Sequence, residues 1–156
     1  MSTTPHSPLR RHRFAAPLSG VWAGVVIGGS LVAAPAKFQA PSLTREVALE
    51  VGRAQFAWLG VTELVLCTAL LAAAFGSGSF RWALGATVVF GLQRLVLMPI
   101  LDERTLRIIA GEAVEPSMLH GIYVAFEVVK LALLLGCTLS GPVFSDTGRP
   151  TVGRNE

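Results

Sequence analysis

Four long apolar segments divide this chain and limit its fold more than any other feature. They cover residues 18–35, 54–75, 80–101 and 118–140. Each is close to the ~20 residues that an α-helix needs to cross a hydrocarbon layer. A segment within lipid must satisfy its own backbone hydrogen bonds, so helices are the expected form. The sequence therefore predicts an all-α integral membrane protein, folded as an antiparallel four-transmembrane-helix bundle.

The composition agrees with a membrane protein. Of the 156 residues, 52% are apolar and only 15% are charged, which is too apolar for an ordinary soluble domain of this length. The net charge of +3 does not indicate nucleic-acid binding, because the basic residues do not gather on one amphipathic element. The only basic run, Arg10, Arg11 and Arg13, directly precedes the first apolar segment, so we expect membrane lipid and no nucleic acid as a partner.

The connections between the segments differ in length and character. Residues 76–79, Gly-Ser-Gly-Ser, predict a tight turn that makes the second and third helices neighbours. Residues 37–53 contain Ser42 and Thr44, either of which can cap a short helix with one apolar face. Residues 102–117 mix apolar and charged positions in a similar way. We therefore predict short interfacial helices in the first and third loops, of which the first runs into the second membrane helix, and we find no internal repeat along the chain.

The tails and the basic residues predict the topology. Residues 1–17 and 142–156 are polar and are expected to be disordered, which leaves 18–141 as the transmembrane domain. The N-terminal arginines place the N-terminus in the cytoplasm, and four crossings return the C-terminus to the same side. This predicts a protein of the bacterial inner membrane whose long loops face outward. The long loops carry basic residues that argue against this orientation: Lys37, Arg45, Arg53, Arg104 and Arg107.

The first apolar segment has two interpretations. A basic run, an apolar stretch and then Ala34-Pro35-Ala36 are typical of a cleavable signal peptide. Against this, Gly20, Gly24 and Gly28 repeat at four-residue spacing and form a stripe of small residues that another helix can approach closely. A signal peptide has no need of such a stripe. We therefore favour a retained helix and expect homo-oligomers that pack through the three glycines.

Polar residues follow one face of the fourth segment. His120, Tyr123, Glu127 and Lys130 are spaced by three, four and three residues, which places them on one side of a helix. Ionisable groups at this depth face the interior of a helix bundle or a wet cavity rather than lipid. The fourth helix is therefore expected to line a polar site.

Other segments supply matching groups at similar depth. Glu63 and Glu127 each lie nine residues into their segments, about 14 Å deep, and Arg94, next to Gln93, lies about 10 Å from the end of the third. All three depths are measured from the end of the bundle that carries the long loops. We predict that these groups meet in one layer below a cavity that opens toward those loops. Arg94 is expected to bridge Glu127 or Glu63, and Lys130 to contact the remaining carboxylate.

Several chemistries are not supported by the sequence. His120 and Glu127 lie two helical turns apart, about 10 Å, so they cannot bind one metal ion together. The chain has no GxSxG, Walker or CxxC motif, and no histidine pair within the membrane that would hold a haem. We therefore expect no metal and no cofactor. Proton chemistry, or binding of a polar group by the charged cluster, remains.

Three functions are open. The leading one is binding or translocation of a small polar or anionic solute or a proton. The first alternative is a membrane-embedded enzyme that acts on a lipophilic substrate, with Glu63, Glu127 and His120 as acid–base residues. The second is a structural or accessory subunit in which the polar network only holds helices together. The candidate binding residues are Glu63, Gln93, Arg94, His120, Tyr123, Glu127 and Lys130.

The first half of the chain resembles a family of small four-helix membrane proteins. The resemblance rests on a glycine-rich first helix, an Ala-Pro pair, a phenylalanine, and a small residue before the second helix. In this sequence they are Gly24, Gly28, Ala34, Pro35, Phe38, Gly52 and Phe56, and His120-Gly121 at the start of the last helix is also similar. The family is the domain-of-unknown-function group related to transmembrane protein 205. The resemblance implies a four-helix membrane architecture and no particular activity.

Overall fold

A computed structural model describes residues 13–140 of the chain. Arg10, Arg11 and the tail predicted over residues 142–156 lie outside the described residues, as do residues 1–12 of the tail predicted over 1–17. The rest of that N-terminal tail is described, and the prediction of disorder is wrong for residues 15–17, which begin the first helix. Every regular element in the described part is a helix, which confirms the all-α prediction.

Four long helical segments make up the structure, and two of them contain irregular stretches. The first consists of α2 (Ala15–Val26), η1 (Ile27–Ala33), α3 (Ala34–Ala36) and η2 (Lys37–Gln39). The second is α4 (Arg45–Ala74); the third is α5 (Phe80–Leu92), η3 (Gln93–Leu97) and α6 (Met98–Ile109); the fourth is α7 (Leu119–Leu139). All four are long and apolar enough to cross a membrane.

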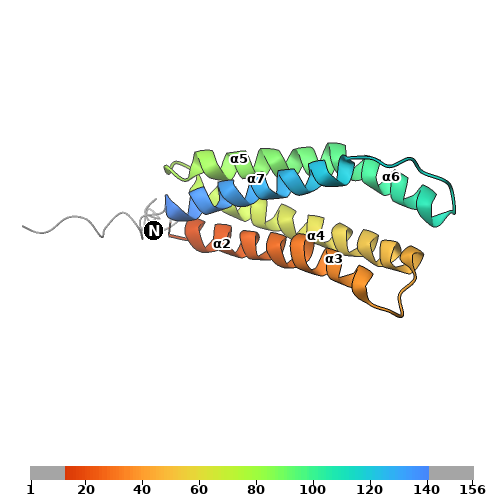
Figure 1. Cartoon of the computed structure of the whole chain (residues 1–156). Helices are drawn as coiled ribbons and strands as arrows, with labels where there is room; N and C mark the ends of the chain where they lie inside the picture. The colour runs from red at the N-terminus through yellow and green to blue at the C-terminus, as the bar shows by residue number, and fades with distance from the viewer. Residues whose placement is uncertain (1–12, 141–156) are drawn as a thin grey trace, which may run out of the picture.

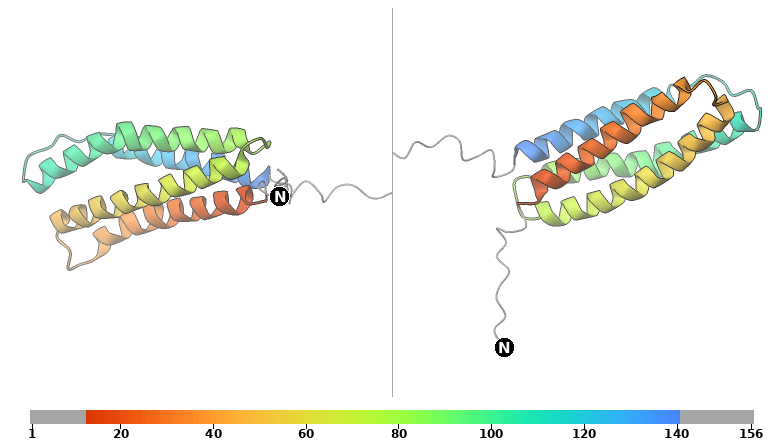
Figure 2. Two further views of the ribbon diagram at one scale, coloured as in Figure 1. Left: turned by 180° about the vertical axis from the view of Figure 1, so that it is seen from behind. Right: turned by 90° about the horizontal axis from the view of Figure 1, so that it is seen from below.

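The four segments lie side by side in one elongated bundle (Figures 1 and 2). The turn at residues 75–79 lies at one end, together with the start of α2 and the end of α7, and we call this the short-turn end. The connections at residues 40–44 and 110–118 lie at the opposite end, which we call the long-loop end. Both α2 and α5 therefore run toward the long-loop end, and both α4 and α7 run back from it.

Two boundaries predicted from the sequence are confirmed. The Thr44 side chain caps α4 by accepting a hydrogen bond of 3.4 Å from the backbone N–H of Val47. Gly76 has a φ of +79°, a left-handed conformation that favours glycine, and it lets the chain turn directly after α4.

Helix is present at both places where the sequence predicts short interfacial helices: the first runs into the second membrane-spanning helix as expected, and the second differs only in being continuous with the third segment. Residues 45–53 are the first turns of α4, and residues 102–109 are the last turns of α6. A helix that runs past its apolar part keeps its backbone hydrogen bonds while its charged side chains reach water. The two extensions are also tied together, because Arg53 Nε lies 2.6 Å from Asp102 Oδ1.

Two π-helical stretches, η1 and η3, interrupt the first and third segments. The N–H of Ala34 bonds to the carbonyl of Gly29, and that of Met98 to the carbonyl of Gln93, five residues back in each case. Pro35 and Pro99 follow directly. A proline has no N–H to donate, and its ring crowds the carbonyl four residues earlier, so the preceding turn widens. Short π-helical stretches of this kind are frequent at functional sites.

The glycine stripe of the first segment faces outward. A Cβ added at Gly20, Gly24 or Gly28 would meet nothing within 4 Å. These glycines therefore do not bring helices of one chain together, and packing against a second copy stays a prediction.

Candidate functional site

Lys130 lies at the centre of a buried ionic cluster. Its Nζ is 2.5 Å from Oε2 of Glu63 and 3.0 Å from Oε2 of Glu127. Glu127 and Lys130 are three residues apart and share a face of α7, whereas Glu63 comes from α4. Glu127 and Lys130 are 0% exposed, and Glu63 is 2% exposed. We call them the buried triad, and their contacts confirm that Glu63, Glu127 and Lys130 meet in one layer.

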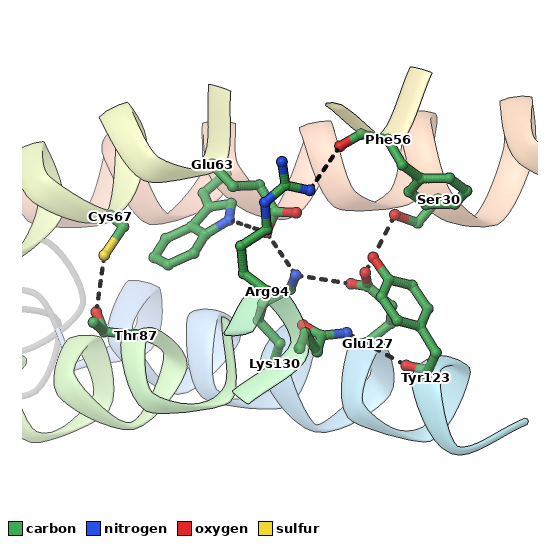
Figure 3. Close-up of polar contacts among 11 residues, drawn as sticks. Ser30, Phe56, Glu63, Cys67, Thr87, Arg94, Tyr123, Glu127 and Lys130 are labelled. Atoms are coloured by element: carbon green, nitrogen blue, oxygen red, sulfur yellow. Dashed lines mark hydrogen bonds and ion pairs between the residues drawn. The ribbon is translucent and has the colours of Figure 1, made fainter. Parts of the chain in front are cut away.

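The first segment supplies two donors that the sequence analysis did not identify. Trp22 Nε1 donates a hydrogen bond of 2.8 Å to Oε2 of Glu63, and Ser30 Oγ donates one of 3.3 Å to Oε1 of Glu127 (Figure 3). Trp22 and Val26 are fully buried. Trp22, Val26 and Ser30 are spaced by four residues and share one helix face, but this spacing does not show which groups the face meets.

The predicted role of Arg94 is wrong. In residues 13–140, Arg94 makes no ion pair with either glutamate; its Nη1 donates to the carbonyl of Phe56 at 3.4 Å instead. The guanidinium packs against Gly60 on α4, where an added Cβ would lie 2.6 Å from Arg94 Cζ. Because Gly60 has no side chain, the Arg94 guanidinium can pack against α4 at this position. In the described residues, Lys130 is the one cation that bridges the two carboxylates.

Gln93 and Tyr123 form a second polar contact beside the triad. Gln93 is 3% exposed, and its Nε2 donates to the backbone carbonyl of Tyr123 at 3.4 Å. The Gln93 Oε1 accepts no hydrogen bond from the described residues. The Tyr123 ring packs edge-on against Phe56, with 5.7 Å between centroids, and its hydroxyl points toward the Glu127 carboxylate (Figure 3).

His120 lies apart from the triad. It is exposed, two turns before Glu127 on α7, and it lines the cavity at the long-loop end. The predicted polar stripe therefore divides into a buried part, formed by Tyr123, Glu127 and Lys130, and an exposed residue at the mouth of the cavity.

The triad has one more carboxylate than ammonium group. Ionised side chains at this depth are expensive when isolated, and the contacts of Lys130 offset much of that cost. Its ammonium also lies 5.8 Å from the centroid of the Phe90 ring. The Glu127 Oε2 is close to Lys130 but accepts no hydrogen bond from the described residues. One carboxylate oxygen of a fully buried residue thus retains capacity for a proton or a cation.

A cavity of about 480 Å³ opens at the long-loop end and extends as far as two residues next to the triad. Ser30 and Tyr123, which both lie against Glu127, belong to its lining. Its other walls come from all four segments and are mainly apolar; the polar members are Lys37, Arg53, Asp102, Thr105 and His120. This confirms the predicted cavity on the long-loop side.

Two further spaces adjoin Arg94. One is a groove of about 740 Å³ between α4 and α6. The other is a space of about 10 Å³ bordered by Glu63, Gln93, Arg94 and Tyr123, among others, which is close to the size of a single water site. Arg94 therefore separates the side of the bundle from the polar interior.

No protein-family model, curated protein or solved structure matches the chain. The resemblance to the group related to transmembrane protein 205 therefore stays an expectation, and the function is inferred from geometry.

Proposed function

We propose that this chain is a multi-pass membrane protein that binds and translocates a proton or a small polar solute at the buried triad. The observation that carries the proposal is the unequal charge: within residues 13–140, Glu63 and Glu127 share a single cationic partner, Lys130. A buried carboxylate without its own cation favours uptake of a proton or of a positively charged group.

The same geometry favours a proton or a cationic group over an anionic solute. Lys130 is fully buried and held by both carboxylates, so its ammonium is not free to bind an anion. A solute that descends the cavity meets the Ser30 and Tyr123 hydroxyls, followed by Glu127. These groups offer oxygen atoms to a donor or a cation.

The cavity gives the site a route to one membrane face. We propose that the helices cross the membrane as an antiparallel bundle, with the termini in the cytoplasm and the long-loop end outside. The site then exchanges with the outer side of a bacterial inner membrane. Ionisable residues buried in a membrane bundle next to such a cavity are typical of proton relays and solute pathways.

Glu127→Gln tests the proposal, because it keeps the shape of the side chain and removes its charge. In liposomes, the purified parent protein is expected to change the luminal pH in response to an imposed ion gradient. The Glu127→Gln variant is expected to show no such ion-driven proton flux. Glu103→Gln, at an exposed position of α6, is the matched control and should leave the flux unchanged.

An enzyme that acts on a lipophilic substrate is the second candidate. The observation in its favour is the cavity itself, since about 480 Å³ of mainly apolar space falls within the ~300–1,000 Å³ of typical ligand pockets. Turnover in detergent without a gradient, lost in Glu127→Gln, would favour the enzyme. A variant that changes only stability, with neither flux nor turnover in the parent protein, would favour a structural subunit.

A further inference from the structure

We infer that residues 15–76 and 79–140 are two copies of one helical hairpin, offset by 64 positions, which place Leu66 and Lys130 at equivalent sites. This inference is independent of the transport proposal. The sequence signal has two parts. Leu31-Val32 and Pro35 correspond to Leu95-Val96 and Pro99, and Glu63, Val65, Leu70 and Leu71 correspond to Glu127, Val129, Leu134 and Leu135. The identities are few, so the repeat is not apparent from the sequence alone, in which none was expected.

The spacing between the two parts is conserved in both copies. Pro35 precedes Glu63 by 28 residues, and Pro99 precedes Glu127 by the same number. A shared helical period can align two amphipathic helices by chance, but it does not carry one register across an intervening loop. Here a single offset aligns both helices of the hairpin, although the loops between them differ in sequence.

The structure repeats at the same offset. The π-helical stretch η1, moved by 64 positions, covers residues 91–97, and η3 (Gln93–Leu97) falls within it. Buried positions also coincide: Ala15 with Ser79, Ser19 with Ala83, Trp22 with Ala86, Val26 with Phe90, Leu70 with Leu134, and Ala73 with Cys137. The two hairpins are thus alike in helix irregularity and in the faces they bury.

The direction of the helices relates the hairpins by rotation about the bundle axis. Each hairpin runs toward the long-loop end, turns there and runs back (Figure 1). Parallel repeats of this kind in membrane proteins carry their sites at the interface between the copies. The triad lies at this interface. Glu63 of the first copy meets Lys130 of the second, and Glu127 of the second copy meets Ser30 of the first.

The repeat shows where the site is asymmetric. Ser30 corresponds to Arg94, and Lys130 corresponds to Leu66, a half-buried leucine that packs against the core. Leu66 follows Glu63 by three residues, as Lys130 follows Glu127. A lysine at position 66 should therefore bridge the same two carboxylates from the other helix. The site has two equivalent positions for an ammonium group, and this chain uses only one.

Relocation of the lysine tests this inference. Lys130→Leu leaves two buried carboxylates without a cation, and we expect the thermal midpoint in detergent to fall by about 10 °C. Adding Leu66→Lys to this variant is expected to recover at least half of the loss. Leu71→Lys is the matched control, because Leu71 is another half-buried leucine of α4 that packs against the core, five residues further along and on a different face. It should recover nothing.

The single substitutions keep the test decisive if Lys130→Leu does not fold. With Lys130 in place, Leu66→Lys gives two carboxylates and two ammonium groups, so we expect a folded protein within a few degrees of the parent, whereas Leu71→Lys should be clearly destabilised. The inference would be overturned if Leu66→Lys and Leu71→Lys gave the same thermal midpoint, either with Lys130 in place or with Lys130→Leu. Flux is not needed for this readout, so a failure of the transport proposal would be seen separately.

Discussion

At the scale of single residues, the site depends on how completely its polar atoms are satisfied. Lys130 neutralises one of the two carboxylates. Trp22 donates a hydrogen bond to Glu63, and Ser30 donates one to Glu127. The Arg53–Asp102 pair near the long-loop end is different, since its side chains are 37% and 39% exposed. Exposed pairs contribute little to stability, whereas loss of one partner from a buried pair typically costs about 3–5 kcal/mol.

Trp22→Phe removes one of these hydrogen bonds together with part of a fully buried side chain. The change keeps an aromatic ring and removes the N–H that donates to Glu63. Hydrogen bonds to charged groups contribute about 1.5–3 kcal/mol and the smaller ring leaves a cavity, so we expect a destabilisation of at least that size. Unfolding by denaturant in detergent, followed by circular dichroism, measures it.

Trp58→Phe is the control for this prediction, because Trp58 is 74% exposed. It is expected to leave the free energy of unfolding nearly unchanged. Equal stability of the two variants would contradict the role assigned to the Trp22 N–H.

At the scale of the elements, the π-helical stretches decide which side chains face the triad. Each widened turn changes the rotation of the residues that follow it about the helix axis. Ser30 lies within η1, and Gln93 and Arg94 open η3. The prolines that follow, Pro35 and Pro99, keep these turns from closing into regular α-helix.

Pro99→Ala tests this coupling between helix shape and site. Alanine can donate its N–H to the carbonyl of Leu95, so the widened turn is expected to tighten toward α-helix. We expect slower hydrogen exchange in residues 95–101 and reduced flux, since Arg94 and Gln93 would move relative to Glu63. Unchanged exchange would show that the proline does not maintain the π-helical turn.

At the scale of the whole molecule, the bundle divides into a closely packed end and an end that contains a cavity. The short-turn end is filled by buried apolar residues of all four segments, such as Trp22, Leu70, Ala83 and Leu134. The long-loop end carries the cavity, and the triad lies between the two halves. The short-turn end thus holds the helices together, and the long-loop end contains the cavity.

The sequence was sufficient for the number of apolar helices, a helix cap at Ser42 or Thr44, the turn at Gly76 and the meeting of Glu63, Glu127 and Lys130. These features follow from segment length, local turn chemistry and depth along a helix. Depth does not determine rotation about the helix axis. For that reason the partner of Arg94 was predicted incorrectly and Trp22 and Ser30 were missed. A widened turn is not visible in residue spacing.

The central claim is that Glu63 and Glu127 act as one site that takes up a single proton beside Lys130. Infrared difference spectroscopy of the protein in lipid, titrated with acid, measures protonated carboxyl groups directly. We predict one buried carboxyl band per molecule, which disappears in both Glu63→Gln and Glu127→Gln and persists in Glu103→Gln. Two independent bands, each removed by only one of the two substitutions, would contradict the account.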